Sequence, residues 1–339
     1  MEILTKVLAF LLSIFVTLVP YGGLAECGIV AKEDDCLFNM EIISDIHIEA
    51  NWPFRTGFLK QALRSFKNAK TPVDALVVPG DLTNYGDEAS LAKFYNTIKE
   101  YSPCPVVAVA GNHDIGHVGD RNKTDITRDE ARQNVIDYYN DYSGQNTENN
   151  YYAIEINGYK FITFGDEVNG YEIKDGEKVP HEGGKWDGIT MTEEELEFID
   201  NELKNREDDS KPCFVVSHWA LDGMNGEDMI WDGSGIDREQ YDVQSILEKY
   251  KNVYYISGHM HGGVRAKAVG EKYNIPMAQK VNGVTYISLP SFGIVNMYGL
   301  TYSGTGAQLE VYEDKVLFRP KNYLTGTWYT NAEYSFELD

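Results

Sequence analysis

Short apolar runs alternate with amphipathic segments along the first part of the chain. Residues 40–44, 75–78 and 106–110 are apolar runs of strand length. Between them, residues 55–70 and 88–100 repeat apolar positions at the spacing of a helix with one buried face. This order of elements predicts parallel strands that are joined by helical crossovers, and therefore an α/β fold.

The second half of the chain has more strand signals than helix signals. Residues 151–156 and 159–165 flank Asn157-Gly158, a pair that favours a tight hairpin turn. Helical patterns cover about 127–139 and 192–205. Further strands are expected over residues 213–216, 253–256, 284–289, 308–312 and 316–319, the last two as a hairpin. Since no segment resembles a linker, we expect one domain.

Three polar segments connect these elements and would shape any pocket. Residues 115–150 are mostly irregular, residues 166–190 are charged and rich in glycine, and residues 221–237 contain many turn-forming residues. We expect long surface loops in the last two. Candidate pocket residues near them are His117, Arg121, Asp166, Glu167, Trp219, Met224 and Trp231. Surface positions, a solvated rim and ordinary loop packing explain them as well or better.

The N-terminus has the pattern of a secretory signal peptide. Lys6 precedes an apolar run from Val7 to Val19, and Gly23-Leu24-Ala25 places small residues where a signal peptidase cleaves. We therefore expect residues 1–25 to be removed, and residues 26–339 to act outside the cytoplasm. The apolar run is short for a membrane span, but an uncleaved N-terminal anchor is the alternative.

Composition limits the class of partner. The 339-residue chain has a net charge of −23 and is 42% hydrophobic, which suits a large core and argues against a broad nucleic-acid-binding surface. A phosphate substrate is still possible, because bound cations can reverse the potential of a site. Export makes a Cys27–Cys36 disulfide possible, whereas Cys104 and Cys213 lie in strand-like runs and are expected to be buried thiols.

Five of the apolar runs are followed by residues of the types that bind metals in proteins. They lead to Asp45-x-His47, Gly80-Asp81, Gly111-Asn112-His113-Asp114, His218 and Gly258-His259-Met260-His261. Ligands bind at the carboxyl ends of the strands in open α/β sheets, so five such ends predict one shared site. Asp, Asn and His supply the oxygen and nitrogen donors of Zn, Fe or Mn sites. The glycines before the ligands indicate tight turns or close approach of backbone.

Histidine is concentrated in these motifs. The chain has seven histidines, and all except His117 and His181 lie in them. Asp45 and His47 are two positions apart, so from an extended backbone their side chains would point the same way. A single Asp-x-His or Gly-Asp is common in ordinary turns. Five motifs in this order, each after an apolar run, are far more specific.

This set of motifs resembles the calcineurin-like metallophosphoesterase superfamily over about residues 40–262. The resemblance implies two packed mixed β-sheets flanked by helices, a four-layer αββα sandwich with a binuclear metal site at its edge. One ion would take Asp45, His47 and His261. The other would take Asn112, His218 and His259, and Asp81 would bridge both. His113 would lie beside the leaving group and would be oriented by Asp114.

The resemblance also implies a reaction. A hydroxide bridging two ions, most plausibly Mn, Fe or Zn, would hydrolyse a small phosphodiester or phosphomonoester. Purple acid phosphatases usually have a tyrosine three residues after the bridging aspartate, where this chain has Asn84, so a purple iron site is disfavoured. Residues 80–86 are similar to bacterial cyclic-nucleotide and glycerophosphodiester phosphodiesterases.

Two other classes of function compete with this one. A metal-binding interaction module of the same fold is the alternative, although such modules lose ligands and this chain keeps all of them. A metalloprotease would need a motif such as His-Glu-x-x-His, which the sequence lacks. Neither the substrate nor the oligomeric state follows from the sequence.

Overall fold

The computed structural model describes residues 35–69, 72–115, 127–167, 171–180, 189–262, 264, 276–294 and 303–339. The expected signal peptide, Cys27, His117, Arg121 and His181 lie outside these residues, so the predictions about them stay predictions. Among the described residues, no helix has the length and hydropathy needed to span a membrane.

The first sheet joins the beginning and the end of the chain. Its strands are β1 (Phe38–Ile42), β2 (Ala75–Pro79), β3 (Val106–Val109), β12 (Thr305–Val311), β13 (Lys315–Asn322), β14 (Thr327–Trp328) and β15 (Tyr334–Glu337). The order is β14-β13-β12-β1-β2-β3, and β15 also pairs with β13. β1, β2 and β3 are parallel, and β12 and β13 form an antiparallel hairpin, which confirms both predictions.

The second sheet is built from the middle of the chain. Its strands are β4 (Tyr152–Ile156), β5 (Tyr159–Thr163), β8 (Cys213–Val216), β9 (Val253–Ser257), β10 (Ala278–Val281) and β11 (Val284–Ser288), in the order β10-β11-β9-β8-β5-β4. The four central strands are parallel. The turn between β4 and β5 has φ of 51° at Asn157 and 79° at Gly158, so the predicted hairpin turn is confirmed.

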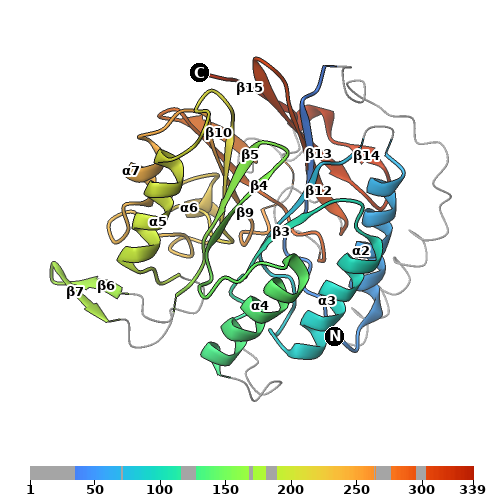
Figure 1. The fold of residues 1–339 in the computed structure, drawn as a ribbon, viewed down its shortest axis with the longest axis horizontal. Helices are drawn as coiled ribbons and strands as arrows, with labels where there is room; N and C mark the ends of the chain where they lie inside the picture. The colour runs from blue at the N-terminus through green and yellow to red at the C-terminus, as the bar shows by residue number, and fades with distance from the viewer. Residues whose placement is uncertain are drawn as a thin grey trace.

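Helices cover the outer faces of both sheets. They are α2 (Pro53–Lys67), α3 (Glu88–Tyr101), α4 (Arg128–Ser143), α5 (Glu193–Lys204), α6 (Glu227–Ile230) and α7 (Val243–Leu247). Figure 1 shows α2 and α3 on one side of the paired sheets and α5 and α7 on the other. The predicted αββα layering is therefore confirmed.

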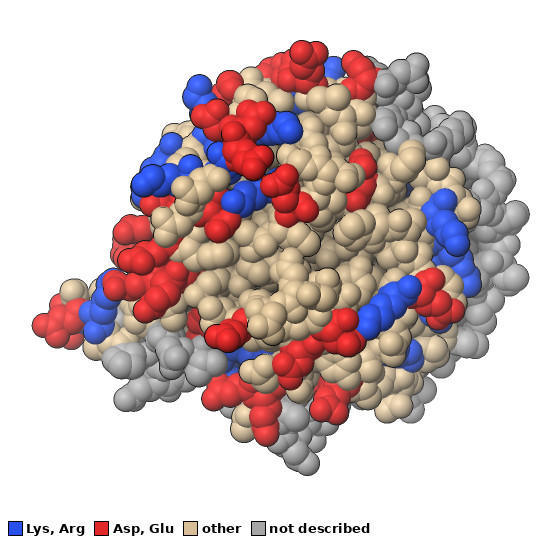
Figure 2. Space-filling model, in the orientation of Figure 1, with Lys and Arg blue, Asp and Glu red and all other residues tan. Residues whose placement is uncertain are grey.

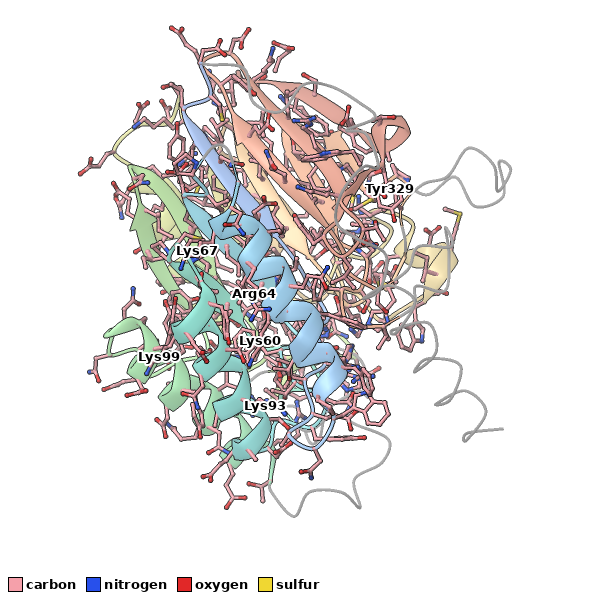
Figure 3. All side chains as sticks on the ribbon, turned by 90° about the vertical axis from the view of Figure 1, so that its right-hand side faces the viewer. Lys60, Arg64, Lys67, Lys93, Lys99 and Tyr329 are labelled. Atoms are coloured by element: carbon pink, nitrogen blue, oxygen red, sulfur yellow. The ribbon has the colours of Figure 1, made fainter. Side chains whose placement is uncertain are left out.

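The α2–α3 layer shows why these segments are helical. In α2 the buried residues recur at helical spacing and include Leu59, Leu63 and Phe66, so one face packs inward. The two helices lie side by side (Figure 3), and the cations of Lys60 and Arg64 lie 4.9 and 5.2 Å from the ring centre of Tyr101 at the end of α3. These cation–π contacts join the two helices.

Aromatic side chains fill the space between the sheets. The ring of Phe38 in β1 lies 6.1 Å from that of Phe161 in β5 and 6.4 Å from that of Phe214 in β8. The hydroxyl of Tyr152 in β4 donates to the carbonyl of Ala108 in β3 at 2.8 Å. It also accepts from the amide of Ala108 at 3.1 Å, so it pairs both polar groups at the edge of the first sheet.

The segment 166–190 differs from the prediction of a long surface loop. It contains a hairpin of β6 (Tyr171–Lys174) and β7 (Glu177–Pro180) around Asp175 and Gly176, which have φ of 53° and 82°. Asp-Gly is a hairpin-turn signal, but the charged residues on both sides masked the short strands. Asp166 is also buried rather than on a rim, because it pairs with Arg128 and Arg132 of α4.

Both cysteines expected to be thiols are thiols. Cys104 and Cys213 form no disulfide. Cys213 is buried, whereas Cys104 is only partly covered. Burial raises the pKa of each thiol to about 12, so both are protonated and weakly nucleophilic at neutral pH.

Candidate metal centre

The five motifs meet at one edge of the sandwich, where parallel strands of both sheets end. Asp45, Asp81 and Asn112 follow β1, β2 and β3 by two or three residues. His218 and His259 follow β8 and β9 by two residues. The convergence predicted from the sequence is therefore present, and it joins the two sheets.

The first group of donors is Asp45, His47, Asp81 and His261. One ligand atom from each lies within 4.8 Å of all the others. Nε2 of His261 is 2.9 Å from Oδ1 of Asp45 and 3.4 Å from Nε2 of His47. Nε2 of His47 is 3.5 Å from Oδ2 of Asp81. The imidazoles and carboxylates thus face one central point, and all except the partly exposed His261 are buried.

The second group continues from the other oxygen of Asp81. Oδ1 of Asp81 is 3.4 Å from Nε2 of His218. That nitrogen is also 3.0 Å from Oδ1 of Asn112 and 3.2 Å from Nδ1 of His259. All of these residues are less than 5% exposed.

The spacing fits a metal better than a set of hydrogen bonds. Ligands about 2.1 Å from one ion lie roughly 3.0–3.4 Å apart in octahedral or tetrahedral geometry, and the distances above range from 2.9 to 3.5 Å. Nδ1 of His218 faces the carbonyl of Pro79 at 2.9 Å. A carbonyl accepts only from N–H, so Nδ1 carries the hydrogen and the lone pair of Nε2 is free for an ion.

Electrostatics of the site favour the ligand forms of these side chains. Burial lowers the pKa of His47, His218 and His259, so each imidazole is neutral. Burial alone would raise the pKa of Asp45, but the charge and hydrogen bond of His261 outweigh it and lower that pKa to about 2. A neutral imidazole and an ionised carboxylate are the states that bind metals.

The backbone at the ligands is left-handed, which corrects the expectation of extended backbone. Asp45, His47, Asp81, His259 and His261 have φ of 54°, 53°, 49°, 67° and 47°. Residues other than glycine seldom adopt such angles, and each instance costs about 1–3 kcal/mol. Five such residues together indicate that the placement of the ligand side chains outweighs the local preference of the backbone.

Glycines allow this close packing, as the sequence indicated. A Cβ at Gly80 would lie 2.3 Å from Nδ1 of His218, and one at Gly111 would lie 2.2 Å from Oδ1 of Asp81. A Cβ at Gly258 would lie 2.0 Å from Oγ of Ser44. These distances are well below van der Waals contact, so only glycine fits at these three positions.

Asp114 was expected to orient the ring of His113, but among the described residues no hydrogen bond joins these two side chains. Its buried carboxylate accepts from the amides of Leu82, Thr83 and Gly111 and from the hydroxyl of Thr83, at 2.7–2.9 Å. Asp114 therefore ties the loop after β3 to the loop after β2. Burial raises its pKa to about 6, although these hydrogen bonds oppose the rise.

A backbone carbonyl orients His113 instead. Nδ1 of His113 is 3.1 Å from the carbonyl oxygen of Asn84, and its amide donates to Oδ1 of Asp81 at 3.0 Å. The ring stands edge-on to His47 with 4.5 Å between centres. Sequence reasoning missed Asn84 as the partner, because a carbonyl leaves no mark in the side-chain pattern.

The residues considered for a pocket wall separate into two kinds. Trp219 and Met224 are buried and belong to the core. Trp231 is 37% exposed, and its ring lies parallel to that of His259, with an interplanar angle of 7° and 5.6 Å between centres. Trp231 therefore borders the metal site.

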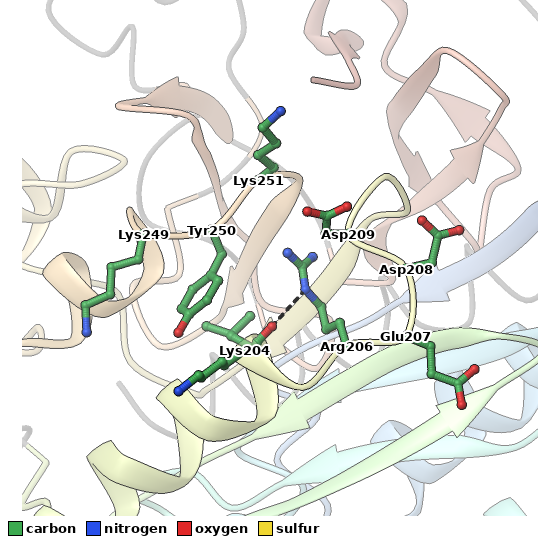
Figure 4. Close-up of a pocket in the computed structure, with 9 residues that line it drawn as sticks. Lys204, Arg206, Glu207, Asp208, Asp209, Lys249, Tyr250 and Lys251 are labelled. Atoms are coloured by element: carbon green, nitrogen blue, oxygen red, sulfur yellow. Dashed lines mark hydrogen bonds between the residues drawn. The ribbon is translucent and has the colours of Figure 1, made fainter.

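A hollow in the surface lies away from these ligands. It encloses about 460 Å³ (Figure 4) at the amino-terminal ends of β8 and β9, opposite the ends that carry His218 and His259. Its walls are Leu203, Lys204, Arg206, Glu207, Asp208, Asp209, Lys249, Tyr250 and Lys251. Mixed lysines and carboxylates do not form a metal site, so the cluster at the carboxyl ends is the functional candidate.

Comparison with known proteins agrees with this geometry. Residues 42–263, nearly two thirds of the chain, match the model of the family described as calcineurin-like phosphoesterase. The chain belongs to this family. Its members are named for phosphoester hydrolysis, and the buried Asp and His cluster supports divalent metal binding in this member.

One of the similar solved structures shares the fold. A purple acid phosphatase from yellow lupin seeds aligns with a TM-score of 0.54 and 13% identity, covering 89% of this chain and 54% of that one. This chain therefore spans about half the length of the lupin protein, and the likeness concerns the fold alone. A predicted phosphoesterase from Streptococcus pneumoniae aligns with a TM-score of 0.39 and 10% identity over 88% of this chain and 97% of that one. No curated protein matches the chain.

Proposed function

We propose that this calcineurin-like phosphoesterase hydrolyses small phosphoesters with two metal ions that share Asp81, and that it does so outside the cytoplasm. The observation that carries the binuclear site is the orientation of one carboxylate. Oδ2 of Asp81 faces His47 at 3.5 Å, and Oδ1 faces His218 at 3.4 Å. Each oxygen thus serves one group of donors.

The two groups differ in their donors. The first group offers two carboxylates and two imidazoles, and the second offers the shared carboxylate, an amide oxygen and two imidazoles. Mn, Fe and Zn all accept this mixture of oxygen and nitrogen. When bound, such ions lower the pKa of water and neutralise charge on a phosphoryl group.

The negative charge of the whole chain is a second reason to expect bound cations. Figure 2 shows acidic side chains around much of the visible face, in keeping with the net charge of −23. A phosphoester would be repelled by this field. Local positive charge at the cluster would have to come from bound ions rather than from a broad basic surface.

His113 is the residue of this site that would meet the ester. Nδ1 is hydrogen-bonded to the carbonyl oxygen of Asn84, so Nε2 is the nitrogen left to face the phosphoryl group or the leaving oxygen. Its edge-on contact with His47 places it beside the first group of donors. A positioned imidazole in this place stabilises or protonates a departing oxygen.

A substrate panel with metal analysis tests the proposal. The purified protein, loaded with Mn, Zn or Fe, is assayed on p-nitrophenyl phosphate, bis-p-nitrophenyl phosphate, cyclic AMP and a glycerophosphodiester. We expect turnover of at least one ester and about two ions per chain. Asp81→Asn should abolish turnover and lower metal content, whereas Asp314→Asn, which changes an exposed carboxylate in the β12–β13 turn, should do neither.

The competing function has a different outcome in the same experiment. A metal-binding interaction module would hold ions and hydrolyse none of the esters with any metal. Full activity of Asp81→Asn would show that this carboxylate is not shared between two ions.

A further inference from the structure

Two large apolar side chains in residues 221–237, the segment that carries Trp231, remain in contact with solvent. Met229 in α6 is 56% exposed, and Trp231, the residue after α6, is 37% exposed. Among the described residues, Leu37 is the remaining large apolar side chain with such exposure. Exposed apolar groups that gather beside a site often contact a ligand.

Trp231 stacks on His259, a proposed metal ligand. Its indole is parallel to the imidazole of His259, within 7°. His259 is only 2% exposed. The part of the indole that lies against His259 is therefore covered, and another part of the indole is accessible to solvent. Nδ1 of His259 points toward His218, and Nε2 has no hydrogen-bond partner among the described residues. Stacking on Trp231 therefore adds to the edge contact with the ring of His218, 4.9 Å between centres, in holding this ring.

The loop that carries Trp231 is held in one conformation by a buried carboxylate. Glu227 is 1% exposed and accepts from the amides of Gly223, Ser234 and Gly235 at 3.1–3.2 Å. A bridge between Leu221 and Ile236 closes the base of the loop. A side chain positioned before binding loses little entropy when a ligand arrives.

Neighbouring charges restrict what can lie against the indole. Asp228 and Asp232 flank the apolar pair in sequence and are exposed. An anionic group in this place would be repelled, whereas a flat uncharged ring would extend the stack begun by His259 and Trp231.

We propose that Trp231 binds a planar, uncharged aromatic group of the phosphoester, such as an aryl or nucleoside moiety. This inference rests on the proposed phosphoesterase function and names its substrate class. Trp231 is a specificity residue in this proposal.

The test compares an aromatic and an aliphatic ester in the same protein. The kcat/KM of bis-p-nitrophenyl phosphate is divided by that of glycerophosphoethanolamine, and this selectivity ratio is measured for each variant, so the intrinsic reactivity of the two esters cancels between variants. Trp231→Ala should lower the ratio by about 5- to 100-fold, the range that corresponds to one lost stacking contact. Trp231→Phe should retain most of it, because a ring remains.

Leu37→Ala is the matched control. It removes an exposed apolar side chain before β1, at the end of this strand opposite Asp45, and should leave the ratio unchanged. Equal losses on both esters, together with lost metal, would overturn the proposal and show that Trp231 only supports His259. A greater loss on the aliphatic ester would also overturn it. A metal-loaded wild type that is inactive on both esters, and also on p-nitrophenyl phosphate and cyclic AMP, would overturn the phosphoesterase function itself.

Discussion

Gly111→Ala is a small change that should disable the site. The added Cβ would lie 2.2 Å from Oδ1 of Asp81, 2.5 Å from its amide nitrogen and 2.9 Å from Cγ. Ordinary carbon–oxygen contact is roughly 3.3 Å, so the carboxylate or its backbone must move by about 1 Å. Asp81 has little room to do so, because it is 1% exposed and lies between the two groups of donors.

The expected magnitudes follow from this displacement. Overpacking of this size costs about 1–3 kcal/mol, which lowers the Tm of a chain of this length by about 2–5 °C. A displacement of about 1 Å at a reacting centre reduces turnover by about 100-fold. The displaced carboxylate should also bind metal ions more weakly. Both ions should be affected, because Asp81 would be shared between them.

Thermal melting, metal content and kcat are measured on the same preparations. Gly57→Ala is the control, because it adds the same methyl group inside α2, where nothing lies within 4 Å, and should stabilise by about 0.5–1 kcal/mol. The reasoning fails if Gly111→Ala keeps both its metal and more than about a third of wild-type kcat.

Four further predictions concern other parts of the molecule. Asp114→Asn should destabilise the protein by about 3 kcal/mol and weaken metal binding, because an amide has one oxygen for four donors. A variant with normal stability and metal content but low kcat would instead support a role of Asp114 in orienting His113. His113→Ala should lower kcat by about 100-fold with metal retained, and loss of metal would instead identify His113 as a ligand. Burial raises the pKa of Glu41 from 4.5 to about 7, so its contribution to stability is complete below pH 4.5 and is lost as the pH rises through 7. The stability lost through this group is about 3 kcal/mol. Glu41→Gln should therefore reduce the fall in Tm between pH 5 and 8. The same dependence of Tm on pH in the variant and the wild type would contradict this. Chelation should lower the Tm, and restoring an ion to 100 times its Kd should add about 2.7 kcal/mol; an unchanged Tm would mean that no ion binds the folded site.

Local pattern was sufficient for the parallel core and the donor set. The apolar runs that became β2, β3 and β8 are continuous because both of their faces are buried, and such runs stand out in a sequence. β1 is equally buried but includes Asn39 and Glu41. Ligand types follow strand ends in every case, so their convergence could be predicted from topology. The hairpin of β6 and β7 was missed because its strands bury little and carry a weak pattern.

The residues that carry the chemistry can be identified from the sequence, because donor atoms and strand ends are local properties of the chain. The orientation of those residues depends on the tertiary fold. The left-handed backbone at Asp45 and His47 exists because contacts from distant strands override local preference. The carbonyl of Asn84 replaces Asp114 as the partner of His113, and Trp231 covers His259. These pairings join atoms that are remote in sequence, so no periodicity or motif encodes them.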